Sequence, residues 1–203
     1  MQKQHKLLTN DTIISIDIET TGLTAGIHSM IELGAVAYRN GKELSSFSGA
    51  MKEWQGSERS IETMRDFWMV KNRTVWDRIR KESRPPEDVM KEFGEWLDSL
   101  PGPLVLAGNP ACFDSGFLFF YMHKFLGEKS VGKYFRRSRA LDIRTFITAL
   151  FAVPYSQAER SVVPEAWTES QPYTHNAIDD ARNQGAMLMN LLKASVGEIE
   201  MEA

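Results

Sequence analysis

The sequence predicts a mixed α/β layer fold, in which helices pack against a central sheet. Strand-like segments fill residues 12–51, and after Trp54 segments with helical spacing alternate with one further short strand. A chain of 203 residues is long enough for one substantial core and short for two full domains. We therefore expect a single domain over residues 1–203, with a short polar lead at 1–10 and an acidic tail at 197–203.

The first predicted elements are three strands. The isoleucine-rich segment TIISIDIE, residues 12–19, is typical of a strand that is buried on at least one face. Residues 20–26, TTGLTAG, are expected to turn, because their two glycines permit backbone angles that other residues resist. Residues 30–51 predict two strands joined at Asn40-Gly41, a dipeptide favoured in tight hairpins.

Helices dominate the rest of the chain. Residues 61–79 carry apolar side chains at helical spacing, and residues 86–100 form a clearer helix with one apolar stripe and a proline in its first turn. LVLAG, residues 104–108, predicts a short strand, and another helix is expected to begin at Phe113. The remaining predictions are a basic loop at 127–140, a short helix at 142–153, a long exposed connection at 154–172 and a last helix from about Asn176.

Composition excludes several classes of protein. The 42% apolar and 25% charged residues are ordinary for a globular domain, and the apolar runs are too short to cross a bilayer. The start of the chain lacks the pattern of a secretory signal, and the single Cys112 cannot form an intramolecular disulfide. These features predict a cytoplasmic protein without a membrane partner. A net charge of −3 argues against a protein that coats nucleic acid nonspecifically, but not against a nuclease.

Two carboxylates mark the end of the first strand. Asp17 and Glu19 are two positions apart, so they project from the same face of a strand. Carboxylates held this close repel unless a cation lies between them, and oxygen ligands suit Mg²⁺ or Mn²⁺. The alternative is a solvated pair at a strand end, which is common for Asp-x-Glu taken alone.

Asp114 is a further candidate ligand, at the start of the helix that follows the strand at 104–108. It could cap that helix and have a purely structural role. However, ligands gather at strand ends in α/β sheets, where Asp114 would meet the first pair.

The segment YTHNAIDDAR supplies the last candidates, His175 and Asp180. Five residues at roughly 100° each would place them about 140° apart on one helix, so His175 belongs more naturally to the preceding loop. From there it could take a proton from water over a metal that Asp180 holds. Asp179 competes with Asp180, and both favour the helix dipole in the first turn. A capping or solvent-exposed histidine is the alternative for His175.

At these positions the sequence resembles the DEDDh exonucleases, the DnaQ-like group with a ribonuclease H-like fold. Residues 17–23 (DIETTGL) resemble the first family motif, 109–118 (NPACFDSGFL) the second, and 175–180 (HNAIDD) the third, His-x-Ala-x-x-Asp. The resemblance extends from about residue 13 to residue 192. It implies a mixed central sheet flanked by helices, and 3′-to-5′ exonuclease activity.

The resemblance also implies roles for individual residues. Asp17 would bridge two divalent cations, Mg²⁺ or Mn²⁺, and Glu19, Asp114 and Asp180 would complete their coordination, which selects Asp180 over Asp179. His175 would deprotonate the attacking water. The residues implied to surround this set are Thr20, Gly22, Leu23 and Asn109 at the 3′-terminal nucleotide, and Asp142 in support of the metal ligands.

Residues 63–79, TMRDFWMVKNRTVWDRI, are similar to a stretch in phage and bacterial members related to the mycobacterial-type 3′-to-5′ exoribonuclease. This chain departs from the usual paired tryptophans by having Phe67-Trp68. Trp68 could stack on a nucleobase, because stacking tolerates any base. Aromatic residues at helical spacing are more often part of the core, which is the alternative for Trp68.

A basic cluster in residues 133–139 could contact the phosphates of a single strand. It consists of Lys133, Arg136, Arg137 and Arg139, with Tyr134 and Phe135 between them. We take Arg136 and Arg137 as candidate substrate contacts. The alternative is a solvated loop.

The leading hypothesis is therefore metal-dependent hydrolysis of single-stranded DNA or RNA from the 3′ end to nucleoside 5′-monophosphates, with two metals and a histidine base. Two alternatives stay open: a catalytically silent nucleic-acid-binding module, and a proofreading subunit that acts with a polymerase. The expected partners are single-stranded 3′ ends, with a homodimer as a further option.

Overall fold

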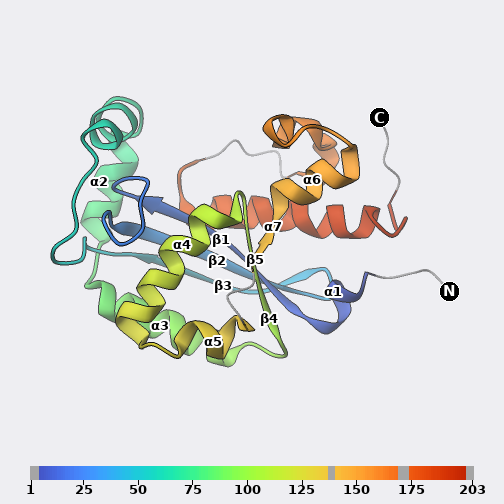
Figure 1. The fold of residues 1–203 in the computed structure, drawn as a ribbon, viewed down its shortest axis with the longest axis horizontal. Coiled ribbons are helices and arrows are strands. Elements are labelled where there is room, and N and C mark those ends of the chain that lie inside the picture. The colour runs from blue at the N-terminus through green and yellow to red at the C-terminus, as the bar shows by residue number, and fades with distance from the viewer. Residues whose placement is uncertain (1–4, 137–139, 169–173, 200–203) are drawn as a thin grey trace.

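The computed structural model describes residues 5–136, 140–168 and 174–199. The described residues form a mixed five-stranded sheet with the order β3-β2-β1-β4-β5 (Figure 1). Its strands are β1 Thr12–Thr20, β2 Met30–Arg39, β3 Lys42–Ala50, β4 Leu104–Gly108 and β5 Ala140–Asp142. β1, β2 and β3 pair antiparallel, whereas β4 runs parallel to β1 and β5 parallel to β4. The predicted mixed α/β fold and the three early strands are confirmed.

The turn between β2 and β3 follows the chemistry of its two residues. Asn40 and Gly41 have φ angles of 53° and 70°. Asparagine and glycine tolerate this left-handed region better than other residues, and two such angles in succession match the twist of a two-residue hairpin. The predicted hairpin is therefore correct.

Helices surround the sheet on both faces and at one end. The α-helices are α1 Lys6–Asn10, α2 Arg73–Glu82, α3 Pro86–Ser99, α4 Ala111–Tyr121, α5 Ser130–Tyr134, α6 Ile143–Phe151 and α7 Ala177–Ala194. The described residues also include the π-helical segments η1 Thr63–Lys71 and η2 Met122–Leu126. They include the short 3₁₀ turns η4 Tyr155–Gln157, η5 Arg160–Val162 and η6 Glu165–Trp167.

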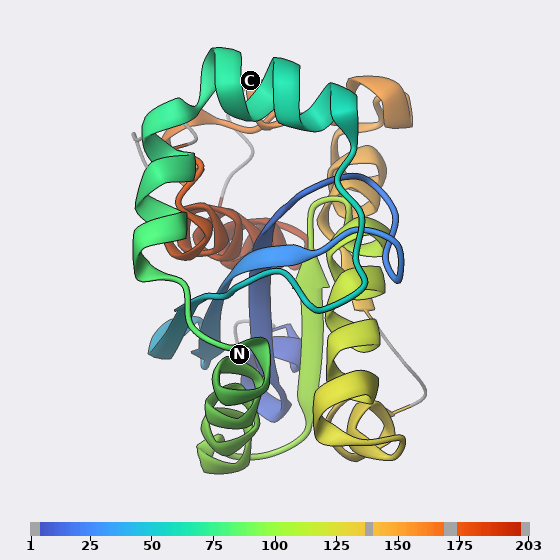
Figure 2. The ribbon, with the colours of Figure 1, turned by 90° about the vertical axis from the view of Figure 1, so that its left-hand side faces the viewer.

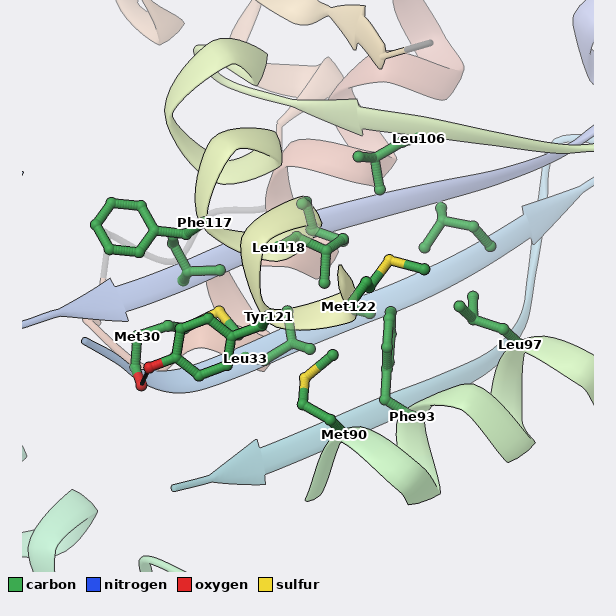
Figure 3. Close-up of a cluster of buried hydrophobic side chains, with 14 of the residues drawn as sticks. Met30, Leu33, Met90, Phe93, Leu97, Leu106, Phe117, Leu118, Tyr121 and Met122 are labelled. Carbon is green, nitrogen blue, oxygen red and sulfur yellow. Dashed lines mark hydrogen bonds between the residues drawn. The ribbon is translucent and has the colours of Figure 1, made fainter. Parts of the chain in front are cut away.

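Two apolar cores hold these layers together. On one face of the sheet, α3 and α4 pack over alternate residues of β1 and β2, and Figure 3 shows Leu33 and Met30 meeting Phe93 and Tyr121 there. The Tyr121 hydroxyl donates to the carbonyl of Met30 at 2.9 Å. On the other face, α7 covers the remaining residues of the same strands together with α1 and α6 (Figure 1). The end of the sheet toward which β1 and β4 run lies between these helical layers.

A third group of buried side chains lies under η1 and α2. Trp68, Trp76 and Ile79 pack on Ile31 and Ala50, which lie at the start of β2 and the end of β3. Figure 2 shows this helical segment arching over the end of the sheet, close to the start of α7. It therefore borders the same end of the sheet as the residues that follow β1.

Several sequence-based boundaries are wrong. Residues 127–140 are not all loop, because α5 lies inside them, and the second late strand, β5, begins at Ala140. These elements have five and three residues, too few to show a period in the sequence. The connection at 154–172 is not fully exposed, since Ala158, Val163 and Trp167 are buried against α6 and α7. The lead at 1–10 contains α1, whose Leu8 joins the same core.

Among the described residues, every helix is too short or too polar to cross a lipid bilayer.

Candidate active site

The end of β1 brings Asp17 and Glu19 to one face of the sheet, as predicted. Glu19 is buried and Asp17 is partly buried. Asp17 pairs across the ladder with Gly34 of β2. A Cβ atom on Gly34 would lie 2.2 Å from the main chain of Ala177, the first residue of α7. The missing side chain therefore allows the start of α7 to lie directly beside Asp17.

Asp114 enters the site from the first turn of α4, which follows β4 after a short turn. Its side chain is buried and its Oδ2 atom lies 3.0 Å from where a Cβ of Gly108 would be. Burial raises the pKa of Asp114 to about 8, although hydrogen bonds from the main chain of Asp114 and Asn109 oppose the shift. Asp114 is therefore buried close enough to Asp17 to interact with its charge, and its role as a ligand stays a prediction.

Asp180 and His175 reach the site from the start of α7. Asp180 is buried in the first turn, and its Oδ1 accepts a hydrogen bond from the main chain of Thr174 at 3.1 Å. His175 precedes the helix, as its angular separation from Asp180 predicted, and has a φ angle of 52°. Its Nδ1 lies 3.6 Å from Oε1 of Glu19. One ligand atom each from Glu19, His175 and Asp180 lie within 4.8 Å of one another.

The four carboxylates share one electrostatic environment. Burial raises the pKa of Asp17 well above its ordinary value, and the charges of Asp114, Glu19 and Asp180 raise it further. Burial also raises the pKa of Glu19 and of Asp180. The Glu19 carboxylate raises the pKa of His175. A divalent cation would oppose these shifts by favouring the ionised carboxylates, so a set of buried oxygen donors fits such an ion.

Two polar residues that sequence reasoning missed complete the site. Gln184 of α7 is buried, and its Nε2 donates to Oδ1 of Asp17 at 2.8 Å. Glu32 of β2 pairs across the ladder with Glu19, is buried, and forms a two-point ion pair with Arg78 of α2 at 2.6 and 3.0 Å. Gln184 could have been found from its position four residues after Asp180, on the same helical face. Glu32 could have been found as a charge inside the apolar run MIELGAVA.

The turn after β1 is held by its own polar atoms. The Thr20 hydroxyl donates to the carbonyl of Gly22 at 2.8 Å, and a Cβ on Gly22 would lie 2.4 Å from the ring of His28. Leu23 at the turn is 76% exposed. Asn109 is partly buried between β4 and α4. These positions border the carboxylates and keep Leu23 free on the surface.

The prediction that Trp68 stacks on a nucleobase is wrong. Trp68 is 0% exposed, and its Nε1 donates to the carbonyl of Thr20 at 2.9 Å, so neither face of its ring is open. The neighbouring Phe67 faces the site instead. Its ring centroid lies 4.9 Å from that of His175, with the rings at 83° to each other.

The described residues of the basic cluster do not line the carboxylate site. Arg136 lines a groove with Pro103 and Leu104 at the beginning of β4, whereas the carboxylates lie at the ends of the parallel strands. Arg136 is therefore not beside the carboxylates, and its role as a substrate contact stays a prediction. Lys133 is paired with Asp98 at 2.6 Å. The other two arginines of the cluster, Arg137 and Arg139, lie outside the described residues.

Asp142 supports the site from behind Asp114. Its Oδ2 accepts from the main chain of Ala111, the first residue of α4, at 2.9 Å. Its Oδ1 accepts from the main chain and the hydroxyl of Thr145 at 2.6 and 2.7 Å. One carboxylate therefore caps two helices and fixes the start of α4, which carries Asp114.

The arrangement can be compared with known proteins. A model of the Exonuclease family matches residues 14–188. The chain belongs to this exonuclease family. The match confirms the predicted exonuclease family and the predicted enzyme class, an exonuclease.

Similar proteins agree with this assignment. The 3′-5′ DNA exonuclease Cap18 of Escherichia coli is 26% identical over 197 residues, covering 91% of this chain and 94% of that protein. The PolC-type DNA polymerase III of Bacillus cereus is 25% identical over 189 residues, which are 93% of this chain but 12% of the polymerase. The nuclease domain of 3′hExo, a DEDDh family member bound to rAMP, superposes with a TM-score of 0.68 at 17% identity, covering 96% of this chain and 97% of that one. This likeness confirms the ribonuclease H-like fold.

Proposed function

We propose that this exonuclease hydrolyses single-stranded DNA or RNA from the 3′ end and releases nucleoside 5′-monophosphates. The observation that carries the proposal is the convergence of four carboxylates, Asp17, Glu19, Asp114 and Asp180, with His175 beside them. A binding module has no need for such a concentration of buried negative charge, because burial of each carboxylate is unfavourable. Metal-dependent hydrolysis at phosphorus does need such a group of carboxylates, because they bind the cations.

The carboxylates would hold two divalent cations, Mg²⁺ or Mn²⁺. When bound, two such ions lower the pKa of a water molecule and neutralise charge on the leaving oxygen. Asp17 would be the ligand that both ions share, because it interacts electrostatically with each of the other three carboxylates. Gln184 then orients Asp17 through its hydrogen bond to Oδ1 and leaves the second carboxylate oxygen free to coordinate.

His175 would accept the proton of the attacking water. Its side chain is 36% exposed, so solvent reaches it. Nδ1 faces Glu19, which leaves Nε2 for the water. An imidazole near neutrality suits proton abstraction at physiological pH.

The turn after β1 would receive the terminal nucleotide. Thr20 and Gly22 offer main-chain groups beside the carboxylates, and the exposed Leu23 offers an apolar surface for a base. Asn109 lies on the opposite border, next to Asp114. The relatives support nucleotide binding of this kind, since Cap18 is named as a DNA exonuclease and 3′hExo was bound to rAMP.

The test is the digestion of matched 5′-labelled DNA and RNA oligonucleotides. With Mg²⁺ or Mn²⁺ we expect stepwise shortening, which EDTA abolishes. His175→Ala should lower kcat by about 10²–10⁴-fold, the range for loss of a general base. Asp17→Ala should abolish turnover while the protein still binds the oligonucleotide. A wild-type protein that binds but never shortens any end would instead support a silent binding module.

A second candidate function is proofreading beside a polymerase. The PolC-type polymerase favours this role, because one segment of that polymerase, about one eighth of its length, is similar to nearly all of this chain. Copurification of a polymerase with the tagged chain would support this role. We also propose a cytoplasmic location. A homodimer is a further proposal, and light scattering of the purified chain would measure its mass.

A further inference from the structure

The side chain of His175 makes its contacts with other elements, Glu19 of β1 and Phe67 of η1. His175 lies two residues before α7, with a left-handed backbone and a partly exposed ring. Asn176, the residue at the cap position of α7, makes no side-chain capping hydrogen bond. The orientation of the imidazole must therefore come from groups on other elements.

The first such group is Phe67 of η1. Its ring meets the ring of His175 at 4.9 Å between centroids and nearly at right angles, a favourable arrangement for aromatic pairs. Phe67 is itself fixed, because its carbonyl accepts hydrogen bonds from both the main chain and the side chain of Asn72 at 3.0 and 3.2 Å. The ring of Phe67 therefore packs against one side of the imidazole.

The second group is the ion pair of Arg78 and Glu32. Arg78 of α2 donates to both carboxylate oxygens of Glu32, and Oε2 of Glu32 also accepts from the main chain of Ala177 at 3.3 Å. Ala177 lies two residues after His175. Glu32 therefore ties the segment that carries His175 to β2, and Arg78 neutralises and orients that buried carboxylate.

Both groups belong to one anchored unit. Residues 63–82, formed by η1 and α2, carry Phe67 and Arg78 on either side of Trp68 and Trp76. The two tryptophan rings pack 5.4 Å apart, and Trp68 donates to Thr20 at the end of β1. π-helical segments such as η1 are rare and occur frequently at functional sites. Figure 2 shows the unit lying over the end of the sheet beside the start of α7.

We propose that Phe67 and Arg78 are positioning residues that set His175 for proton transfer, through the ring contact and through Glu32 respectively. The inference rests on the proposed role of His175 as the base. Neither side chain needs to touch the nucleic acid. Their loss should therefore lower kcat and leave KM unchanged, and only while His175 is present.

The experiment is a double-mutant cycle with Mn²⁺ and a single-stranded DNA oligonucleotide. Phe67→Ala should lower kcat by roughly 10–100-fold, the range for partners that orient a site residue from outside it. In the His175→Ala background the same change should have no further effect, because the group that it positions is gone. Phe67→Tyr keeps the ring and should restore most of kcat.

Val70→Ala is the matched control, since Val70 lies on the same π-helix and is 73% exposed. Arg78→Gln should repeat the pattern of Phe67→Ala, with a loss of kcat that vanishes in the His175→Ala background. Melting temperature and Mn²⁺ affinity of each variant are measured alongside. If Phe67→Ala unfolds the protein, Phe67→Leu gives the same test with less volume lost.

Three outcomes would overturn the inference. The first is a raised KM with unchanged kcat in Phe67→Ala, which would make Phe67 a substrate contact. The second is an equal loss of kcat in the wild-type and His175→Ala backgrounds, which would make its role general packing. The third is a wild-type kcat in both Phe67→Ala and Arg78→Gln. An inactive wild-type protein would instead overturn the proposed function, so the two failures are distinguishable.

Discussion

The two sides of the active site are held by different means. On the strand side, Asp17 and Glu19 belong to β1, which is hydrogen-bonded to β2 along its length and to β4 in its first part. On the helix side, His175 and Asp180 come from the start of α7, where tertiary contacts replace a side-chain cap. Sheet geometry alone therefore places one half of the site, whereas the other half depends on a few close contacts between distant parts of the chain.

Among the substitutions that test the helix side of the site, Gly34→Ala should lower activity the most, because it displaces the start of α7. The new Cβ would lie 2.2 Å from the main chain of Ala177, so the start of α7 must move away from β2. A displacement of about 1 Å at reacting groups can cost roughly 10²-fold in rate, and we expect a loss of that size in kcat. The measurement is steady-state digestion of a 5′-labelled oligonucleotide.

Gly116→Ala is the control for this substitution. Gly116 is in α4, and nothing lies within 4 Å of the position that its Cβ would take. Alanine is the better residue in a helix by roughly 0.5–1 kcal/mol, so this variant should be active and slightly more stable. Equal activity of the two glycine variants would show that the approach of α7 to β2 does not matter for catalysis.

Gln184→Ala tests the direct link between the two sides. Gln184 of α7 donates to Asp17 of β1 at 2.8 Å, and among the residues that the structure describes it is the one side chain that does so. Removing a group that orients a metal ligand typically costs about 10–100-fold in affinity or activity. We expect a loss near the lower limit, because the strand still holds Asp17.

The control for Gln184→Ala is Asn190→Ala on the same helix. Asn190 donates to the carbonyl of Trp167, away from the carboxylates. Metal titrations of both variants identify the cause of any loss. A weaker Mn²⁺ affinity in Gln184→Ala alone supports the orienting role, and unchanged affinity with unchanged kcat contradicts it.

The same contrast explains how far sequence reasoning succeeds. Strand periodicity correctly placed Asp17 and Glu19 on one face, and helical geometry correctly put His175 outside α7. These are local properties. The choice of Asp180 needed the family resemblance, because both aspartates lie in the same turn.

Local sequence patterns did not predict the contacts between elements that are distant in the chain. The approach of α7 to Gly34 depends on how α7 packs on β2. The ion pair of Glu32 with Arg78 and the burial of Trp68 depend on the packing of α2 and η1. Arg136 shows a related limit, since a basic pattern in the sequence does not tell at which end of the sheet it lies, and Arg136 lines a groove at the beginning of β4. Local patterns predicted the elements and their faces, but not which side chains meet.

Stability should depend on pH through the buried carboxylates. In the folded, metal-free protein the pKa of Asp114 is about 8, whereas an unfolded aspartate has a pKa of about 3.9. The folded state therefore binds the proton of Asp114 more tightly than the unfolded state does. The stability that this proton contributes is complete below about pH 3.9 and is lost as the pH rises through about 8. The raised pKa of His175 acts in the same direction above its ordinary value.

The melting temperature in EDTA should thus fall as the pH rises from 5 toward about 8, by a few degrees for each kcal/mol lost. Mg²⁺ or Mn²⁺ should reduce this fall, because a cation stabilises the ionised carboxylates. Asp114→Asn removes one of the titrating groups and should reduce the fall in EDTA without abolishing it, because the pKa values of Asp17, Glu19 and His175 are also raised. A melting temperature in EDTA that rises over this range would contradict the assignment of buried, proton-binding carboxylates.

The smallest effect is expected far from both sides of the site. Arg136 is exposed and lines the groove beside Pro103 and Leu104, at the end of the sheet opposite the carboxylates. Surface substitutions away from specific contacts usually change free energies by no more than about 0.5 kcal/mol, so Arg136→Ala should alter kcat and KM by less than about twofold. A salt titration of oligonucleotide binding sharpens the test, since loss of a phosphate contact would reduce the dependence of affinity on salt. An unchanged salt slope in Arg136→Ala would exclude Arg136 as a phosphate contact, whereas a reduced slope would support one.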